Sequence, residues 1–198
     1  MSHVRRFMNS IRLRSFSALK YRDPVPFLVK LRQLEVRMLE ADLPDHVRAL
    51  RTNKLKKWRE LREAALFCYF IGQRGKTPVY LAEGESQDFD FVAVCQGSET
   101  IEYTPVQLKE VVPTNTNPDA ALEPVLASLI KYTDSTDLAV VIHLNQVTHF
   151  NPKDVLIPKL TIGSLWMFGA ISEDQEHWGL WGDFLQSCVG TRHEYPAA

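Results

Sequence analysis

The stretch from Asp88 to Pro113 constrains this chain most, because its pattern fits two β-strands joined by a turn at Gln96-Gly97-Ser98. Side chains alternate between the two faces of a strand. We therefore expect Gln107 and Lys109 to share one face of the second strand, while the apolar residues between them face the other way. This hairpin is the element around which the rest of the chain is interpreted.

The same hairpin is expected to bring Asp90 close to Gln107. With the turn centred near Gly97, Asp90 would lie opposite Thr104 or Pro105 and diagonal to Gln107. An acid, an amide oxygen and an ammonium would then converge on a small patch. Such a patch is able to hold a divalent cation and a developing negative charge.

The run Asp90-Phe91-Val92, the turn, and then Gln107-Leu108-Lys109 resembles the PD-(D/E)XK nuclease superfamily, which has the restriction-endonuclease-like fold. The resemblance implies a metal site made of Asp90, the Gln107 oxygen, the Leu108 carbonyl and Glu63, which sits where the helical acid of the family is expected. It implies that Lys109 orients or helps to deprotonate the attacking water. The implied catalytic residues are Lys109, Asp90, Glu63 and Gln107, and the implied cofactor is Mg²⁺ or Mn²⁺.

Two positions depart from the motif of that superfamily. Phe89 replaces its proline, and Gln107 stands where an acid is commoner. A glutamine offers a carbonyl oxygen without a charge, so a metal would be held more weakly. The expected function is a magnesium-dependent endonuclease that hydrolyses phosphodiester bonds, with DNA favoured over RNA. The alternative is a non-catalytic module with a degenerate site that binds nucleic acid or protein.

Length and composition favour one domain with an elaborated terminus, because 198 residues bury one good core. We expect a basic helical extension over residues 1–57, an α/β nuclease-like core over 58–190 and a tail over 191–198. No apolar run approaches the ~20 residues that span a bilayer. Cys68, Cys95 and Cys188 are far apart and odd in number, which favours reduced thiols in a cytoplasmic protein, and Cys68 and Cys95 lie within apolar segments, so we expect them to be buried.

The net charge of −1 hides a large asymmetry. Residues 1–62 hold sixteen Lys or Arg and six Asp or Glu, a net charge of +10, whereas residues 63–198 have a net charge of −11. A basic helix over 47–62 would hold a polyanion over the site through Arg48, Arg51, Lys54 and Lys57. The alternative, to which we give equal weight, is that the basic half and the acidic half pair with each other.

Residues 1–22 contain basic residues and serines but no acid. This composition is typical of a basic arm that lies on nucleic acid, which we favour. It is also typical of a mitochondrial targeting segment, and that alternative stays open. A homodimer stays open as well.

Apolar spacing predicts helices over 27–41, 61–71 and 120–132, and strands over 79–82, 137–144, 165–171 and 179–184. The fold class is therefore α/β: a mixed central sheet flanked by helices, with a restriction-endonuclease-like core and the basic helical N-terminal extension. Glu63 is expected to point inward and to need a cation, a proton or an arginine partner. His143 is expected to be a core or edge histidine. Trp166, Trp178 and Trp181 are expected to serve packing, with base stacking as the less favoured alternative.

Overall fold

The computed structural model describes residues 10–41, 43–44, 47, 51–52, 54–84, 88–146 and 150–197. Within these ranges, seven strands form one mixed sheet in the order β1-β2-β3-β4-β5-β6-β7. The bounds are β1 Val79–Glu83, β2 Phe91–Gln96, β3 Ile101–Val111, β4 Ser135–Leu144, β5 Ile162–Ala170, β6 His177–Gly182 and β7 Val189–Glu194. An α/β fold with a mixed sheet is thus confirmed.

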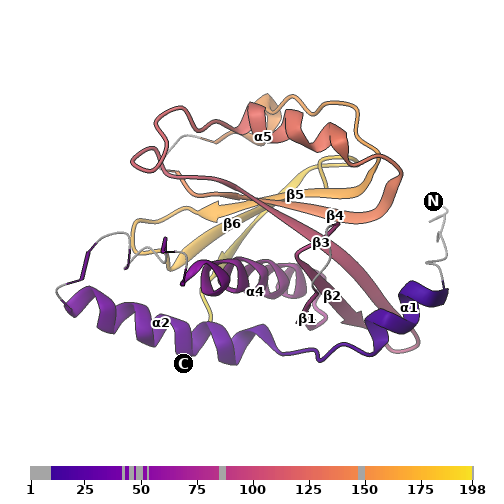
Figure 1. Ribbon diagram of the computed structural model, residues 1–198, viewed down its shortest axis with the longest axis horizontal. Helices are drawn as coiled ribbons and strands as arrows, with labels where there is room; N and C mark the ends of the chain where they lie inside the picture. Colours follow the sequence, from indigo (N-terminus) through magenta and orange to yellow (C-terminus); the bar gives the residue numbers. More distant parts are fainter. Residues whose placement is uncertain are drawn as a thin grey trace.

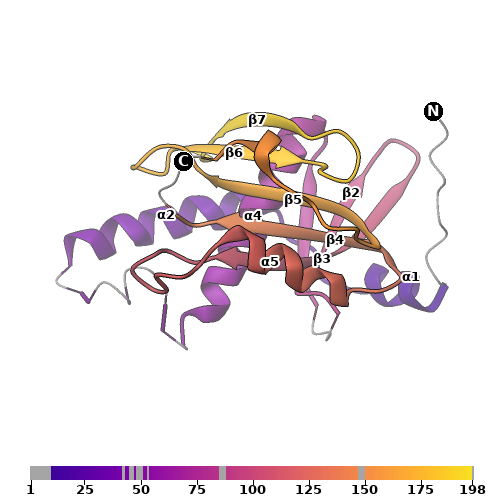
Figure 2. The same ribbon diagram turned by 90° about the horizontal axis from the view of Figure 1, so that it is seen from above.

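The pairing of neighbouring strands changes from antiparallel to parallel and back again across the sheet. The strands β1, β2 and β3 form an antiparallel meander, β3, β4 and β5 run parallel, and β5, β6 and β7 are again antiparallel. Figure 2 shows β3 to β7 side by side in this order. The carboxyl ends of the three parallel strands therefore meet at one edge of the sheet.

Helices cover both faces of the sheet (Figure 1). α4 (Lys56–Gly75) lies along one face, α5 (Leu122–Ser128) lies over the other, and α2 (Pro24–Glu40) packs outside α4. α1 (Ser10–Ser17) and two short 3₁₀ helices, Leu129–Lys131 and Pro152–Asp154, complete the described helical elements. The structure is therefore layered, with α4 sandwiched between α2 and the sheet.

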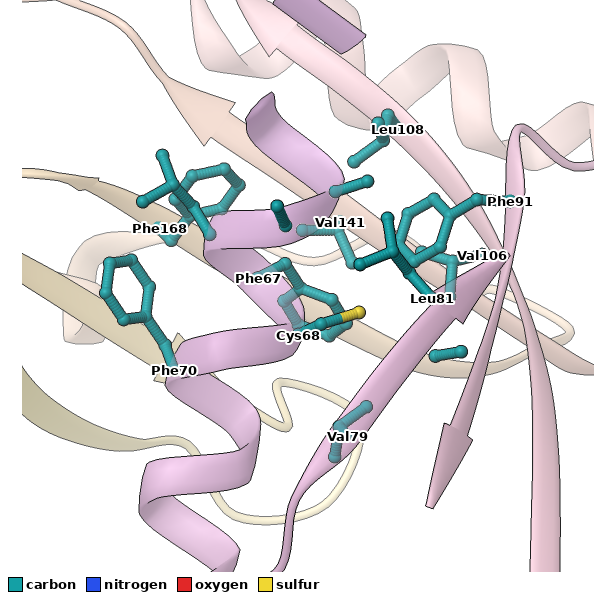
Figure 3. Packing of buried hydrophobic residues seen from close by; sticks show 14 of the residues in the cluster. Phe67, Cys68, Phe70, Val79, Leu81, Phe91, Val106, Leu108, Val141 and Phe168 are labelled. Atoms are coloured by element: carbon teal, nitrogen blue, oxygen red, sulfur yellow. The ribbon is translucent and has the colours of Figure 1, made fainter. Parts of the chain in front are cut away.

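The core lies between α4 and the sheet, as Figure 3 shows for Phe67 and Phe70 of the helix against Phe168 of β5. α4 is almost wholly apolar from Ala64 to Phe70, so it is buried on nearly every side. Each fully buried large apolar side chain contributes about 1.5–3 kcal/mol relative to leaving it in water. Lys76 ends the helix in the left-handed conformation, and its N–H donates to the Gly72 and Gln73 carbonyls.

The segments at both ends of the described chain pack against the rest of the fold. Leu28 of α2 is fully buried, and the Tyr195 hydroxyl donates to its carbonyl at 3.0 Å. Phe16 of α1 packs edge-to-face on Phe89, with ring centroids 5.5 Å apart. Arg22 forms an isolated antiparallel bridge with Leu81 of β1. These contacts fasten the N-terminal helices to the sheet.

Three details differ from the sequence-based expectations. β7 extends the sheet to Glu194, where the sequence offered no strand signal. The helix expected over 47–62 is wrong in its first part, because α4 begins at Lys56 and the described residues Arg51, Thr52, Lys54 and Leu55 are not helical, while residues 48–50 and 53 lie outside the described ranges. All three thiols are free, but only Cys68 is buried, whereas Cys188 is exposed. None of the described helices is long and apolar enough to cross a membrane.

Candidate active site

Asp90 lies at a fork in the sheet. β2 pairs with β3 only as far as Phe91 and Val106, and beyond that point β3 continues with β4. The Asp90 N–H donates to the Val106 carbonyl at 2.9 Å, and the Leu108 N–H donates to Asp90 Oδ2 at 2.6 Å. The carboxylate thus takes the place of the strand that β3 lacks here.

The register of the hairpin differs from the expected one. The sequence placed Asp90 opposite Thr104 or Pro105, but the pairing of Phe91 with Val106 moves it beside Gln107. The reason is the turn, which spans Gly97 to Thr100 and is closed by the Gly97 N–H donating to the Thr100 carbonyl at 2.9 Å. The longer turn brings the acid and the amide into direct contact.

Two oxygens converge on the side-chain nitrogen of Gln107. Its Nε2 donates to Asp90 Oδ2 and lies 3.3 Å from the Leu108 carbonyl oxygen. The amide is buried, so its partners are fixed by the surrounding sheet. A donor therefore occupies the position between a carboxylate and a carbonyl, which is the kind of position that a cation also fills.

Burial raises the pKa of the Asp90 carboxyl above its usual value. The Leu108 N–H and the positive charges of Lys109 and Lys56 act in the opposite direction, while the negative charge of Glu63 adds to the rise. Burial prevails because the nearby protein charges do not fully compensate the carboxylate. The fork is therefore a position where an added positive charge would be favourable.

Lys109 shares a strand face with Gln107, as the alternation of β3 predicted. Its Nζ lies 5.8 Å from the centroid of the Tyr132 ring, on the side of the sheet that α5 covers. A hollow of about 620 Å³ opens beside the fork and is lined by Asp90 and Leu108 together with Lys56 and Lys57 of α4. The positive charges of Lys109 and Lys56 both act on the acid, from opposite sides of the sheet, and Lys56 was not predicted from the sequence.

Glu63 points inward as expected and is only 4% exposed, but it belongs to a different group of side chains. Its Oε1 lies 3.3 Å from His143 Nδ1 and 4.0 Å from Arg59 Nε. Potential ligand atoms of Glu63, Glu110 and His143 all lie within 4.8 Å of one another. Within the described part of the chain, the effect of Glu63 on Asp90 is that its negative charge raises the Asp90 pKa.

Glu110 faces away from Gln107, as the alternation of side chains along β3 requires, and lies near Glu63. It forms an ion pair with Arg51, accepts a hydrogen bond from Asn145 Nδ2 at 2.8 Å and lies 3.8 Å from Arg59 Nε. Burial alone would raise the pKa of this carboxyl, but the Asn145 hydrogen bond and the Arg51 charge outweigh it and lower the pKa. We call Glu63, Glu110, His143, Arg51 and Arg59 the arginine-bound cluster.

The arginine-bound cluster was not predicted from the sequence, although two features of the sequence indicate the positions of Glu110 and His143. Glu110 is two residues from Leu108, which places both on the face that α4 covers. Glu110 is also paired in register with His143 of β4, so their side chains are neighbours in adjacent strands. The contribution of Arg51, 59 residues away in sequence, carried no such signal.

The four predicted phosphate-binding residues have different surroundings. Arg48 lies outside the described residues. Arg51 is largely buried in its ion pair with Glu110, whereas Lys54 is exposed. Lys57 Nζ lies 2.7 Å from Glu83 but its side chain remains 74% exposed. Of the three that lie within the described ranges, Lys54 and Lys57 present accessible charge and Arg51 does not.

No family model, no curated protein and no solved structure matches this chain. The site is accordingly interpreted from its own chemistry and from the motif resemblance described above.

Proposed function

We propose that this protein is a magnesium-dependent nuclease that hydrolyses phosphodiester bonds, with DNA as the expected substrate. The observation that carries the proposal is the convergence of Asp90 Oδ2 and the Leu108 carbonyl on the Gln107 amide at the fork. The resemblance of the segments around Asp90 and Lys109 to the PD-(D/E)XK motif supports the same interpretation.

The donor set at the fork fits Mg²⁺ or Mn²⁺. It offers a carboxylate, a backbone carbonyl and, after rotation of the Gln107 amide, a side-chain carbonyl, and Mg²⁺ prefers such hard oxygen ligands. The raised pKa of Asp90 is consistent with a carboxylate that lacks a full counter-charge. When bound, the ion would lower the pKa of a water molecule and neutralise charge on the phosphate.

The residues of this chain would hold the substrate around that position. Lys109, whose charge acts on Asp90, would orient the attacking water and attract the scissile phosphate. Lys56 and Lys57 line the hollow beside Asp90, on the side of the sheet that α4 covers, and would contact the flanking phosphates. Leu61, Phe89 and Phe91 make an apolar wall beside Asp90 and would limit the access of bulk water.

Glu63 would act on this site indirectly. Its carboxylate contacts His143 and Arg59, so a direct bond to an ion at the fork would require these contacts to be exchanged. We therefore propose that Glu63 contributes through its negative charge or through an intervening water molecule.

A second candidate is a non-catalytic module that binds nucleic acid or protein. The observation that favours it is that the Gln107 amide already satisfies Asp90 by hydrogen bonding, without any ion. A protein of this kind would bind its partner equally well in a chelator and in Mg²⁺.

The proposal is tested by incubating the protein with single-stranded DNA, duplex DNA and RNA in Mg²⁺, Mn²⁺ or EDTA. We expect cleavage that requires the metal and is lost in Asp90→Asn. Asp88→Asn is the matched control. It removes the same charge from an exposed side chain that lies two residues before Asp90. Metal-dependent cleavage that persists undiminished in Asp90→Asn would contradict the proposal.

A further inference from the structure

A second hollow, of about 520 Å³, lies at the carboxyl ends of β4 and β5. It is lined by aromatic and polar side chains, among them His143, Gln146, Phe150, Trp178 and Trp181, together with Arg62 of α4. Ligands of α/β proteins commonly bind outside the carboxyl ends of parallel strands, in pockets of this size. Neither the motif around Asp90 nor the proposed chemistry accounts for this hollow.

Trp181 forms a fixed aromatic wall of the hollow. Its indole lies over Gly179 and Gly190, where an added Cβ would come within 2.3 and 2.8 Å of the ring, respectively. Glycine at these two positions therefore lets the ring lie close against the strands. Phe150 packs edge-to-face on the indole with ring centroids 4.8 Å apart. Two rigid rings thus bound one side of the hollow.

The polar groups around the hollow are already oriented by other contacts. His143 Nδ1 lies 3.3 Å from Glu63, and Nε2 has no hydrogen-bond partner among the described residues. Gln146 Nε2 donates to the Val112 and Ala120 carbonyls at 2.8 and 2.9 Å, which leaves its Oε1 as an acceptor. The hollow therefore offers fixed hydrogen-bonding groups beside its aromatic wall.

The positive charge at the hollow is neutralised by the protein. Arg62 Nε lies 2.9 Å from Glu35, and its guanidinium donates to Gln175 Oε1 at 2.8 Å and stacks over Trp178. A phosphate would therefore find no accessible cation in Arg62. A neutral, planar ring with donors and acceptors on its edge fits the lining better.

We propose that this hollow binds one unpaired nucleobase, stacked against Trp181 and contacted by His143 and Gln146. The inference rests on the proposed nuclease function and specifies its substrate class: a nucleic acid that is single-stranded or contains an unpaired nucleotide. The first turns of α4 separate the two hollows, since Lys56, Lys57 and Leu61 line one and Arg62 lines the other. A helix is ~10–12 Å across, so one strand can reach both.

The test measures binding in EDTA, where hydrolysis does not contribute. The probes are a fluorescein-labelled 12-residue oligothymidylate and the same backbone with abasic residues throughout, each titrated by fluorescence anisotropy. We expect the base-containing strand to bind about tenfold more tightly, because stacking of one base on an aromatic side chain has this size. Trp181→Leu should bind the two strands with equal affinity. Trp166→Leu, which alters a half-buried tryptophan on β5, should keep the tenfold preference for the base-containing strand.

A second variant covers the case in which Trp181→Leu fails to fold. Ala170→Phe fills the hollow from an exposed position on its rim and should also bind the two strands with equal affinity. Equal affinity of the wild-type protein for both strands, or a ratio that survives in the folded variants, would overturn the inference. Metal-dependent cleavage without a base preference would support the proposed function and contradict base binding in this hollow. A base preference without cleavage would support base binding and contradict the proposed nuclease function.

Discussion

Asp90 and Glu110 are two carboxylates on or beside the same strand, Asp90 exposed at the fork and Glu110 largely buried, and their pKa values shift in opposite directions. At the fork, burial raises the pKa of Asp90 despite the nearby Lys109 and Lys56. In the arginine-bound cluster, the Asn145 hydrogen bond and the Arg51 charge overcome burial and lower the pKa of Glu110. Hydrogen bonds and positive charges therefore outweigh the effect of burial at Glu110, whereas at Asp90 they compensate it only in part.

This difference indicates where an external cation would be most favourable. Glu63, Glu110 and His143 bring ligand atoms within 4.8 Å, as a metal site does, but Arg51 and Arg59 already balance their charge. Proximity of ligand atoms is therefore a weaker guide to a metal site than the absence of compensation. By this argument the cluster stabilises the fold, and the fork carries the proposed chemistry.

The largest expected effect separates the two regions by activity. We expect Asp90→Asn and Lys109→Ala to lower metal-dependent cleavage by more than about 100-fold, because an ion stabilises reacting charge by several kcal/mol and about 1.4 kcal/mol corresponds to tenfold. Both variants should unfold cooperatively in urea. A loss of cooperativity in Lys109→Ala would instead mark this lysine as structural.

The next effect concerns stability. Removing one partner of a largely buried ion pair leaves the other uncompensated, so Glu110→Gln or Arg51→Gln should lower the free energy of unfolding by about 3 kcal/mol. The double variant Arg51→Gln/Glu110→Gln should lose less than the sum of the two. Urea denaturation measures all three, and single-variant losses below about 0.5 kcal/mol would remove the structural role of the cluster.

A gain is expected at the fork from Gln107→Glu. The substitution adds a negative charge beside Asp90 and the Leu108 carbonyl, so Mg²⁺ should bind about tenfold more tightly. Calorimetric titration gives the affinity, and unchanged affinity would indicate that the Gln107 side chain does not reach the ion.

Salt dependence distinguishes the two kinds of basic residue. Each phosphate contact adds about −0.9 to the slope of log affinity against log salt on duplex DNA, so Lys54→Gln/Lys57→Gln should flatten the slope by up to about two units. Arg51→Gln should leave the slope unchanged, because Arg51 pairs with Glu110. The reverse pattern would restore Arg51 as a phosphate-binding residue.

The smallest expected effect is that the contributions of Asp90 and Glu110 to stability change with pH in opposite directions. The lowered pKa of Glu110 contributes stability above the unfolded value of about 4.3, and this is lost as pH falls through the folded value. The raised pKa of Asp90 acts oppositely, so its contribution is most favourable below about 3.9 and declines as pH rises through the folded value. At pH 7 Asp90→Asn should therefore be at least as stable as the wild type by thermal melting, and Glu110→Gln less stable.

The sequence predicted the local geometry of this site better than its long-range contacts. Strand alternation correctly placed Gln107 and Lys109 on one face of β3, and apolar spacing correctly predicted that Glu63 points inward. Register failed, because the length of the turn at Gly97 decides it and several turns fit the same residues. The cluster escaped prediction because Arg51, Glu63 and His143 meet only through the packing of separate elements.

The most direct test of the central claim is a calorimetric titration of Mn²⁺ and Mg²⁺ into the wild-type protein, Asp90→Asn and Glu110→Gln. Circular dichroism at the titration temperature confirms that each variant is folded. We expect one site in the wild type that Asp90→Asn abolishes and folded Glu110→Gln retains. Binding that survives in Asp90→Asn but disappears in Glu110→Gln would place the ion in the arginine-bound cluster, and would contradict the assignment of the fork as the metal site.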